Sequence, residues 1–167
     1  MQLEFGYGTG TQTVSLPDKN VVDVLLANPM THEHLGADAV RCALEHPIGA
    51  PRLRELAKPG QKIAIVASDI SRPVPSWDIL PAILDELSAA GCRDEDITVV
   101  FALGSHRHHT DEERRRLAGA DVYSRVRCVD SDPDDCVHLG STKCGTPVDV
   151  TRVVAEADFR ICTGNIE

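Results

Sequence analysis

The sequence has no apolar run long enough to cross a membrane. A membrane-spanning helix needs about 18 or more consecutive, mostly apolar residues, whereas the longest apolar runs, near residues 62–68 and 96–103, are far shorter. The opening residues, MQLEFGYGTGTQ, also lack the basic and apolar segments of a secretory signal. We therefore expect a cytoplasmic protein without a membrane partner.

Basic residues are also fewer than acidic residues. The chain has 17 Lys and Arg residues against 26 Asp and Glu residues, which gives a formal net charge of −9 at pH 7. Such a balance repels the phosphates of nucleic acids unless basic residues cluster locally. The composition therefore disfavours a nucleic-acid partner.

The cysteines do not follow the spacing of a disulfide framework or a zinc ribbon, because none of them forms a CxxC pair. Free cysteine often serves as a small buried apolar residue. We therefore expect reduced, structural thiols at all six positions, which are Cys42, Cys92, Cys128, Cys136, Cys144 and Cys162.

Several common catalytic signatures are missing too. The sequence has no GxGxxG after a strand, no GxxxxGK[ST], no GxSxG and no HExxH. These absences argue against a dinucleotide fingerprint, a P-loop, a hydrolase nucleophile elbow and a helical zinc-protease site.

What the sequence does contain fits one globular domain of 167 residues, 42% of them hydrophobic. We divide it into an α+β preface, residues 1–60, and a core, residues 61–167. In the preface, alternating apolar residues predict a β-hairpin from Leu3 to Leu16 and a further strand from Asn20 to Leu26. Helical spacing predicts helices from Leu35 to His46 and from Arg52 to Ala57.

In the core, apolar runs typical of buried strands alternate with amphipathic helices. This alternation predicts an α/β fold that is Rossmann-like, with a mostly parallel sheet flanked by helices. The predicted strands are Lys62–Ser68, Asp96–Leu103 and Phe159–Cys162, with shorter ones at Arg127–Asp130, Cys136–Leu139 and Pro147–Val150. The predicted helices are Trp77–Ala90, the segment that follows Thr110, and Val153–Ala157.

Three polar loops follow the main predicted strands, at residues 69–73, 104–110 and 163–165. In a parallel sheet such loops converge on one edge. Arg72 could grip a carboxylate or phosphate there through two parallel N–H bonds. His106 could act as a general acid or base, because an unperturbed imidazole titrates near pH ~6.5.

Other interpretations of these loops remain open. The first loop could be a surface turn with an internal ion pair between Asp69 and Arg72. The histidines His106, His108 and His109 could be solvated loop residues or a metal cluster, although their spacing lacks the fixed geometry of helical ligands. Thr110 and Glu113 have the spacing of a helix capping box.

The loops DISRPVP, ALGSHRHHTDEE and TGNIE, in this order and spacing, resemble the N-terminal domain of the nickel-dependent lactate racemase family. The resemblance covers essentially the whole chain. The family usually has Thr at the position of Ser71, and this change keeps the hydroxyl. In the family GNIE is normally followed by Pro-His and a glycine-rich segment that ends in lysine. We therefore expect this sequence to be a truncation of a longer two-domain protein, with a missing C-terminal segment as its partner.

The resemblance implies a racemase or epimerase of small 2-hydroxy acids that uses a nickel-pincer nucleotide as hydride acceptor. His106 matches a catalytic histidine and Arg72 the arginine that holds the substrate carboxylate. Cofactor-binding loop positions are matched by Asp69, Ser71, Thr110, Gly164 and Asn165.

The resemblance also implies that the cofactor anchor, the nickel ligand and the second catalytic histidine lie beyond Glu167. None of the matched residues is then a metal ligand, and the isolated chain is expected to be inactive. Two other functions remain as alternatives: a non-catalytic module that binds a small anion, and a metal-dependent hydrolase that uses the cluster from His106 to His109.

Overall fold

A computed structural model describes residues 1–29, 31, 33–72 and 74–165 of the chain. The chain separates into two compact units, residues 1–33 and residues 34–167. The predicted loop residues Pro73, Ile166 and Glu167 lie outside the described residues. The division at residue 60 stays a prediction.

The first unit is built on the predicted β-hairpin. Strands β1 (Gln2–Tyr7) and β2 (Gly10–Ser15) pair antiparallel, with Leu3 opposite Val14. The turn between them needs Gly8, whose φ of 59° lies in the left-handed region that favours glycine. A short 3-10 helix, η1 (Asp18–Asn20), follows the hairpin.

The predicted strand from Asn20 to Leu26 is wrong. Residues 21–29 all lie in the described part of the chain and form no regular element. The side chains of Val22, Leu25 and Leu26 are largely exposed. A strand is held by hydrogen bonds to a neighbouring strand, and the apolar pattern of this segment gave no information about whether such a neighbour exists.

The second unit contains a four-stranded parallel sheet in the order β5-β4-β3-β8. Its strands are β3 (Ile63–Ser68), β4 (Ile97–Ala102), β5 (Arg127–Asp130) and β8 (Phe159–Cys162). In the central register, Ile65 lies opposite Val99 on one side and Ile161 on the other. This arrangement confirms the predicted α/β fold with a parallel sheet.

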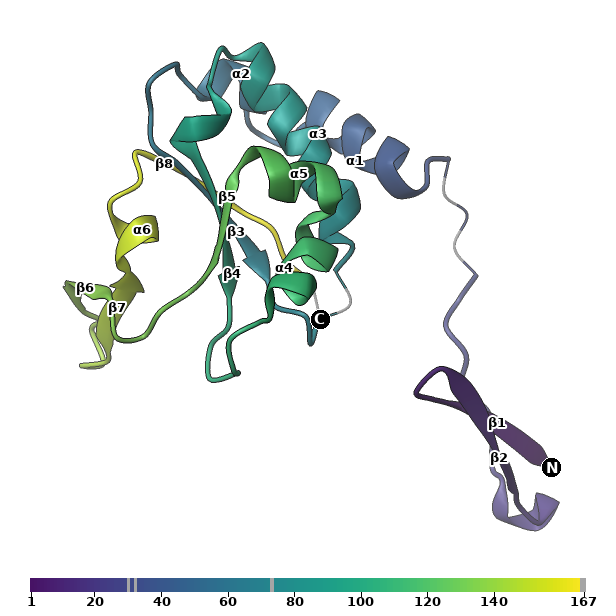
Figure 1. Ribbon diagram of the computed structural model, residues 1–167. Coiled ribbons are helices and arrows are strands. Elements are labelled where there is room, and N and C mark those ends of the chain that lie inside the picture. Colours follow the sequence, from purple (N-terminus) through teal and green to yellow (C-terminus); the bar gives the residue numbers. More distant parts are fainter. Residues whose placement is uncertain (30, 32, 73, 166–167) are drawn as a thin grey trace. The chain divides into compact units, whose positions relative to one another are not determined.

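The helices of the second unit lie mainly on one face of the sheet (Figure 1). They are α1 (Gly36–Glu45), α2 (Leu53–Leu56), α3 (Ser76–Ala89), α4 (Asp111–Ala118) and α5 (Ala120–Arg125). The core between α3 and the sheet includes Leu80, Leu84, Leu87, Val99 and Phe101, all fully buried. Each buried side chain of this size contributes about 1.5–3 kcal/mol, so α3 is firmly attached to the strands that precede and follow it.

Helix α5 was not predicted, because Gly119 looks like the end of the preceding helix. Gly119 does end α4, but with a φ of 80° it also starts α5 directly. A Cβ at this position would lie 3.5 Å from the Cβ of Trp77. Gly119 therefore allows α5 to follow α4 without an intervening loop.

A small hairpin and a short helix lie on the other side of the sheet in Figure 1. They are β6 (Cys136–Ser141), β7 (Pro147–Thr151) and α6 (Arg152–Ala155). The sequence predicted both strands and the helix nearly at these bounds. The two strands pair with each other antiparallel and form a sheet of their own.

One buried carboxylate joins α2 to α3. The Glu86 side chain is 6% exposed, and its Oε1 accepts a hydrogen bond from Arg52 at 2.6 Å. Arg54 donates to both carboxylate oxygens through Nε at 3.0 Å. These bonds, foremost those from Arg54, outweigh the effect of burial and lower the pKa of Glu86 to about 2.

Among the described residues, no helix is both long enough and apolar enough to span a bilayer. Each of the six cysteines carries a free thiol. Burial raises the pKa of the Cys128 thiol to about 11, so this thiol is unreactive at neutral pH.

Candidate functional site

The loops that follow β3 and β4 enclose a hollow of about 310 Å³ at the carboxyl edge of the sheet. Ligands of open parallel sheets bind at this edge. The two residues on which the sequence analysis relied most, Arg72 and His106, both line this hollow. The other lining residues are Val66, Ala67, Ser68, Asp69, Ala102, Leu103, Gly104, Ser105 and Thr163.

Asp69 and His106 form a close pair in the lining of this hollow. Asp69 is the first residue after β3, and its side chain is 6% exposed. Its Oδ2 lies 2.5 Å from Nδ1 of His106, and its Oδ1 accepts a hydrogen bond from the Ser71 hydroxyl at 2.8 Å. The loop after β3 and the loop after β4 are therefore joined by a charged hydrogen bond.

The charge state of Asp69 determines which nitrogen of His106 is available. Burial alone would raise the pKa of Asp69, but the hydrogen bonds from His106 and Ser71 outweigh it, and the pKa lies below its usual value. An ionised carboxylate can only accept, so Nδ1 of His106 carries the proton. Within the described part of the chain, Nε2 has no hydrogen-bond partner, and the ring is 50% exposed.

Backbone hydrogen bonds hold the loops in tight turns. The amide of Arg72 donates to the carbonyl of Asp69 at 3.1 Å, and the amide of His106 donates to that of Leu103 at 3.0 Å. The third loop begins at Thr163, whose amide donates to Val66 at 2.9 Å. The first two loops are thus closed by hydrogen bonds of their own, and the third is attached to β3.

The third loop adds a second hollow beside the first. This hollow has a volume of about 260 Å³ and is lined by Ser68, Arg72, Gly164 and Asn165. Arg72 therefore lies where the two hollows meet. Two of the five residues that the resemblance matched to cofactor binding, Gly164 and Asn165, are brought to this place.

The structure places Thr110 elsewhere. Thr110 is the N-cap of α4, where its hydroxyl accepts from the amide of Glu113 at 3.2 Å. The Glu113 carboxylate in turn accepts from the amide of Thr110 at 2.8 Å. The predicted capping box is confirmed, and Thr110 does not line either hollow. A contact of Thr110 with a cofactor stays a prediction.

His109 is not a solvated loop residue, because its side chain is only 2% exposed. Its Nε2 accepts a hydrogen bond from the amide of Ile70 at 3.1 Å, and its Nδ1 lies 2.7 Å from Oδ1 of Asp130. Both ring nitrogens are thus engaged within the protein. His108 differs from it, since its side chain is 64% exposed.

Asp130 also lies at this edge of the sheet, but the sequence did not single it out as a site residue. It ends β5, and its position at the carboxyl end of a short predicted strand was the feature that could have indicated it. Among the described residues, no group of three His, Cys, Asp or Glu side chains is arranged to hold a metal ion. With both nitrogens of His109 engaged, the histidine cluster offers no support for a metal-dependent hydrolase.

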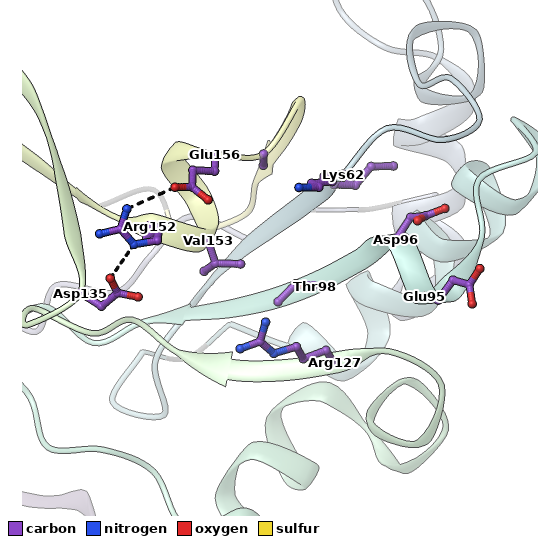
Figure 2. Close-up of a pocket in the computed structure, with 11 residues that line it drawn as sticks. Lys62, Glu95, Asp96, Thr98, Arg127, Asp135, Arg152, Val153 and Glu156 are labelled. Carbon is purple, nitrogen blue, oxygen red and sulfur yellow. Dashed lines mark hydrogen bonds and ion pairs between the residues drawn. The ribbon is translucent and has the colours of Figure 1, made fainter.

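A larger hollow of about 440 Å³ lies near the amino ends of β3 and β4, where its lining includes Ile63 and Thr98 (Figure 2). Within its lining, Arg152 donates to Asp135 at 2.7 Å and to Glu156 at 3.2 Å. The loop edge is the candidate functional site, because Arg72 and the Asp69–His106 pair come together there.

Comparisons with known proteins identify the family of the chain. Two curated relatives are lactate racemases: one from Thermoanaerobacterium thermosaccharolyticum, 30% identical over 170 residues, and one from Lactiplantibacillus plantarum, 34% identical over 170 residues. Each alignment covers 99% of this chain and 40% of the relative. The chain therefore spans well under half the length of the racemases it matches.

A solved structure and a family model also match this chain to lactate racemases. The structure of the lactate racemase apoprotein from Thermoanaerobacterium thermosaccharolyticum matches with a TM-score of 0.78 and 30% sequence identity. The match covers 97% of this chain and 38% of that one. The model of the lactate racemase N-terminal domain matches residues 7–167. The chain therefore belongs to the lactate racemase N-terminal domain family.

Proposed function

We propose that this chain supplies the substrate-binding and acid–base residues of a racemase or epimerase that acts on small 2-hydroxy acids such as lactate. The observation that carries the proposal is the shared hollow, in which Arg72 and the Asp69–His106 pair lie together. We place the reaction in the cytoplasm, because the free thiols of the chain suit a reducing compartment.

His106 acts on the hydroxyl group of the substrate in this proposal. Its unprotonated Nε2 accepts the hydroxyl proton as the 2-hydroxy acid is converted to the planar 2-oxo acid, while the hydride of the α-carbon would pass to the cofactor. Asp69 holds the ring through Nδ1 and compensates the positive charge that the ring then carries. Asp69 and Ser71 thus support His106, and a contact of either side chain with a cofactor stays a prediction.

Arg72 holds the carboxylate group of the substrate. A guanidinium group can donate two parallel hydrogen bonds to a carboxylate, which fixes both the position and the plane of the substrate. The turn from Asp69 to Arg72 then sets the distance between the held carboxylate and the base. Such positioning accounts for a large part of the rate of many enzymes.

The resemblance implies a nickel-pincer nucleotide as cofactor, and the donors at the loop edge suit its anionic parts. Ser68, Arg72, Gly164 and Asn165 offer a hydroxyl, a guanidinium group, an unhindered backbone and an amide around one hollow. The described residues provide no cluster of metal ligands, so they would hold the nucleotide and not the nickel. When bound, the cofactor would supply the acceptor for the hydride of the substrate's α-carbon.

The full-length protein that contains this chain provides the test of the function. Incubated with L-lactate after cofactor loading, it should produce D-lactate until both enantiomers are present in similar amounts, as chiral chromatography would show. Conversion of a different small 2-hydroxy acid would support the reaction class and correct the substrate. Binding of these acids without any conversion would support the anion-binding module instead.

The isolated 167-residue chain should neither racemise lactate nor retain nickel after dialysis. The reason is that its described residues hold no group of metal ligands, and hydride transfer requires a carrier fixed against the α-carbon. Metal analysis of the dialysed chain and chiral analysis of lactate would check this. Measurable racemisation by the isolated chain would show that the catalytic groups have been misassigned.

Replacing Arg72 with Lys in the full-length enzyme should raise KM about tenfold or more and lower the rate as well. Lysine keeps the charge but loses the planar fork, and a charged hydrogen bond contributes about 1.5–3 kcal/mol. Steady-state kinetics would measure the effect. Arg107→Lys is the matched control, because Arg107 pairs with Glu113 and should tolerate the change. An unchanged KM in the Arg72→Lys enzyme would remove Arg72 from the substrate site.

A further inference from the structure

We propose that His109 is a positioning residue. It fixes the turn that contains Arg72 against the loop that contains His106. This inference rests on the proposed function, because it concerns the geometry of that same site. His109 has no part in the proton transfer described above, yet it is among the few polar residues that are buried in the described part of the chain.

The contacts of His109 link three elements at the edge of the sheet. Its ring accepts the hydrogen bond of Ile70, which lies directly after Asp69 in the first loop. On its other side the ring contacts Asp130 at the end of β5. The ring also packs edge-to-face against Phe101, with centroids 5.6 Å apart and planes at 83°. These contacts leave the ring a single orientation.

The same contacts determine where the proton of the ring lies. The Ile70 amide can only donate, so Nε2 must be unprotonated in order to accept its hydrogen bond. Nδ1 therefore carries the proton and donates to Asp130 at 2.7 Å. Burial alone would raise the pKa of Asp130, but the hydrogen bonds from His109 outweigh it and the pKa is lowered. A neutral ring between an ionised acceptor and an amide donor satisfies every polar group involved.

The position of the link explains why it matters for the site. Ile70 lies within the turn closed by the hydrogen bond from Arg72 to Asp69. His109 follows His106 in the second loop, three residues along the chain. Without the link, the turn could shift relative to the loop, and a displacement of about 1 Å at a catalytic site can reduce the rate about 10²-fold.

Two substitutions separate the two hydrogen bonds of the ring. In His109→Gln, the side-chain oxygen can reach the place of Nε2 and still accept from Ile70. In His109→Asn, the shorter amide can reach only the place of Nδ1, so it keeps the bond to Asp130 and loses the one to Ile70. The two variants bury similar amide groups, and they serve as controls for each other.

The kinetic test uses the full-length, cofactor-loaded enzyme. His109→Asn should lower kcat/KM about 10- to 100-fold, mainly through a higher KM for the 2-hydroxy acid, because the turn that carries Arg72 is released. His109→Gln should stay within about threefold of the wild type, since the bond to Ile70 remains. Equal losses in both variants would overturn the proposal, because a purely structural role does not distinguish the two bonds.

Hydrogen exchange of the Ile70 amide gives a readout that needs no activity. The amide should remain protected in the wild type and in His109→Gln, and exchange faster in His109→Asn. Nitrogen NMR of the wild-type ring gives a second one, with a protonated Nδ1 and an unprotonated Nε2 expected. The opposite tautomer would overturn the proposal even if a variant failed to fold.

These readouts also distinguish a failure of the positioning role of His109 from a failure of the proposed racemase function. If the wild-type enzyme racemises 2-hydroxy acids but the Asn and Gln variants behave alike, the positioning role of His109 is wrong and the function stands. If the wild type converts no 2-hydroxy acid but the Ile70 amide follows the expected pattern, the link stands and the function is wrong.

Discussion

Replacing His106 with Ala in the full-length enzyme should lower kcat by about 10²–10⁴-fold, the usual contribution of a general acid–base residue. The substitution removes the nitrogen that accepts the hydroxyl proton. It also leaves the Asp69 carboxylate without the partner that lies 2.5 Å away. Because His106 contacts the substrate's hydroxyl in this account, the loss should appear in kcat more than in KM.

The cofactor should still be loaded in the His106→Ala enzyme, so nickel content and kcat must be measured on the same preparation. His108→Ala is the matched control: its ring is 64% exposed and lies 3.4 Å from Asp130, so it should retain nearly full activity. If His106→Ala kept near wild-type kcat with nickel bound, His106 would be an ordinary loop residue. His108, the exposed histidine of the same loop, would then be tested as the base.

Replacing Glu86 with Gln should reduce the free energy of unfolding by about 1–2 kcal/mol, less than for a fully buried ion pair, because Arg54 is 42% exposed and water solvates its released charge. Glutamine offers a single acceptor oxygen to the two arginines and places an amide donor beside them. The released charges of Arg52 and Arg54 would then lie near the junction of α2 and α3. Urea unfolding at neutral pH would measure the change.

The stability that Glu86 provides should depend on pH in a defined direction. Its folded pKa of about 2 lies below the ordinary value of 4.5. A depressed carboxylate pKa stabilises the fold at pH values above the unfolded value, and this contribution is lost as the pH falls from about 4.5 towards 2. The wild type should therefore lose more stability over this range than Glu86→Gln.

Asp85→Asn is the control for Glu86→Gln, because Asp85 is the neighbouring acidic residue of α3 and is exposed. It changes the net charge equally and should alter stability by less than about 0.5 kcal/mol. If both variants unfolded at the same urea concentration, the buried ion pairs of Glu86 would not stabilise the junction.

The parallel sheet could be predicted from the sequence because its two central strands, β3 and β4, are largely buried and read as continuous apolar runs. The predicted strand Lys62–Ser68 starts one residue before β3, and the predicted strand Asp96–Leu103 exceeds β4 by one residue at each end. The run from Asn20 to Leu26 shows the limit of this reasoning. It has the composition of a strand, but a strand requires a neighbour, and a local pattern does not reveal one.

The site could be predicted in part for a similar reason. Loops after parallel strands converge, and this rule alone brought Arg72 and His106 to one hollow. The pairing of Asp69 with His106 could not be predicted, since it depends on the closure of two turns. The burial of His109 could not be predicted either, because it depends on Asp130, which lies 21 residues further along the chain.

The most direct test of the account is a crystal structure of the full-length protein with a 2-hydroxy acid bound. The substrate carboxylate should lie within hydrogen-bond distance of the Arg72 guanidinium group. The substrate hydroxyl should lie about 2.6–3.2 Å from Nε2 of His106, while Nδ1 stays on Asp69. A 2-hydroxy acid bound away from this edge of the sheet, for example in the hollow of Figure 2, would contradict the assignment of the site.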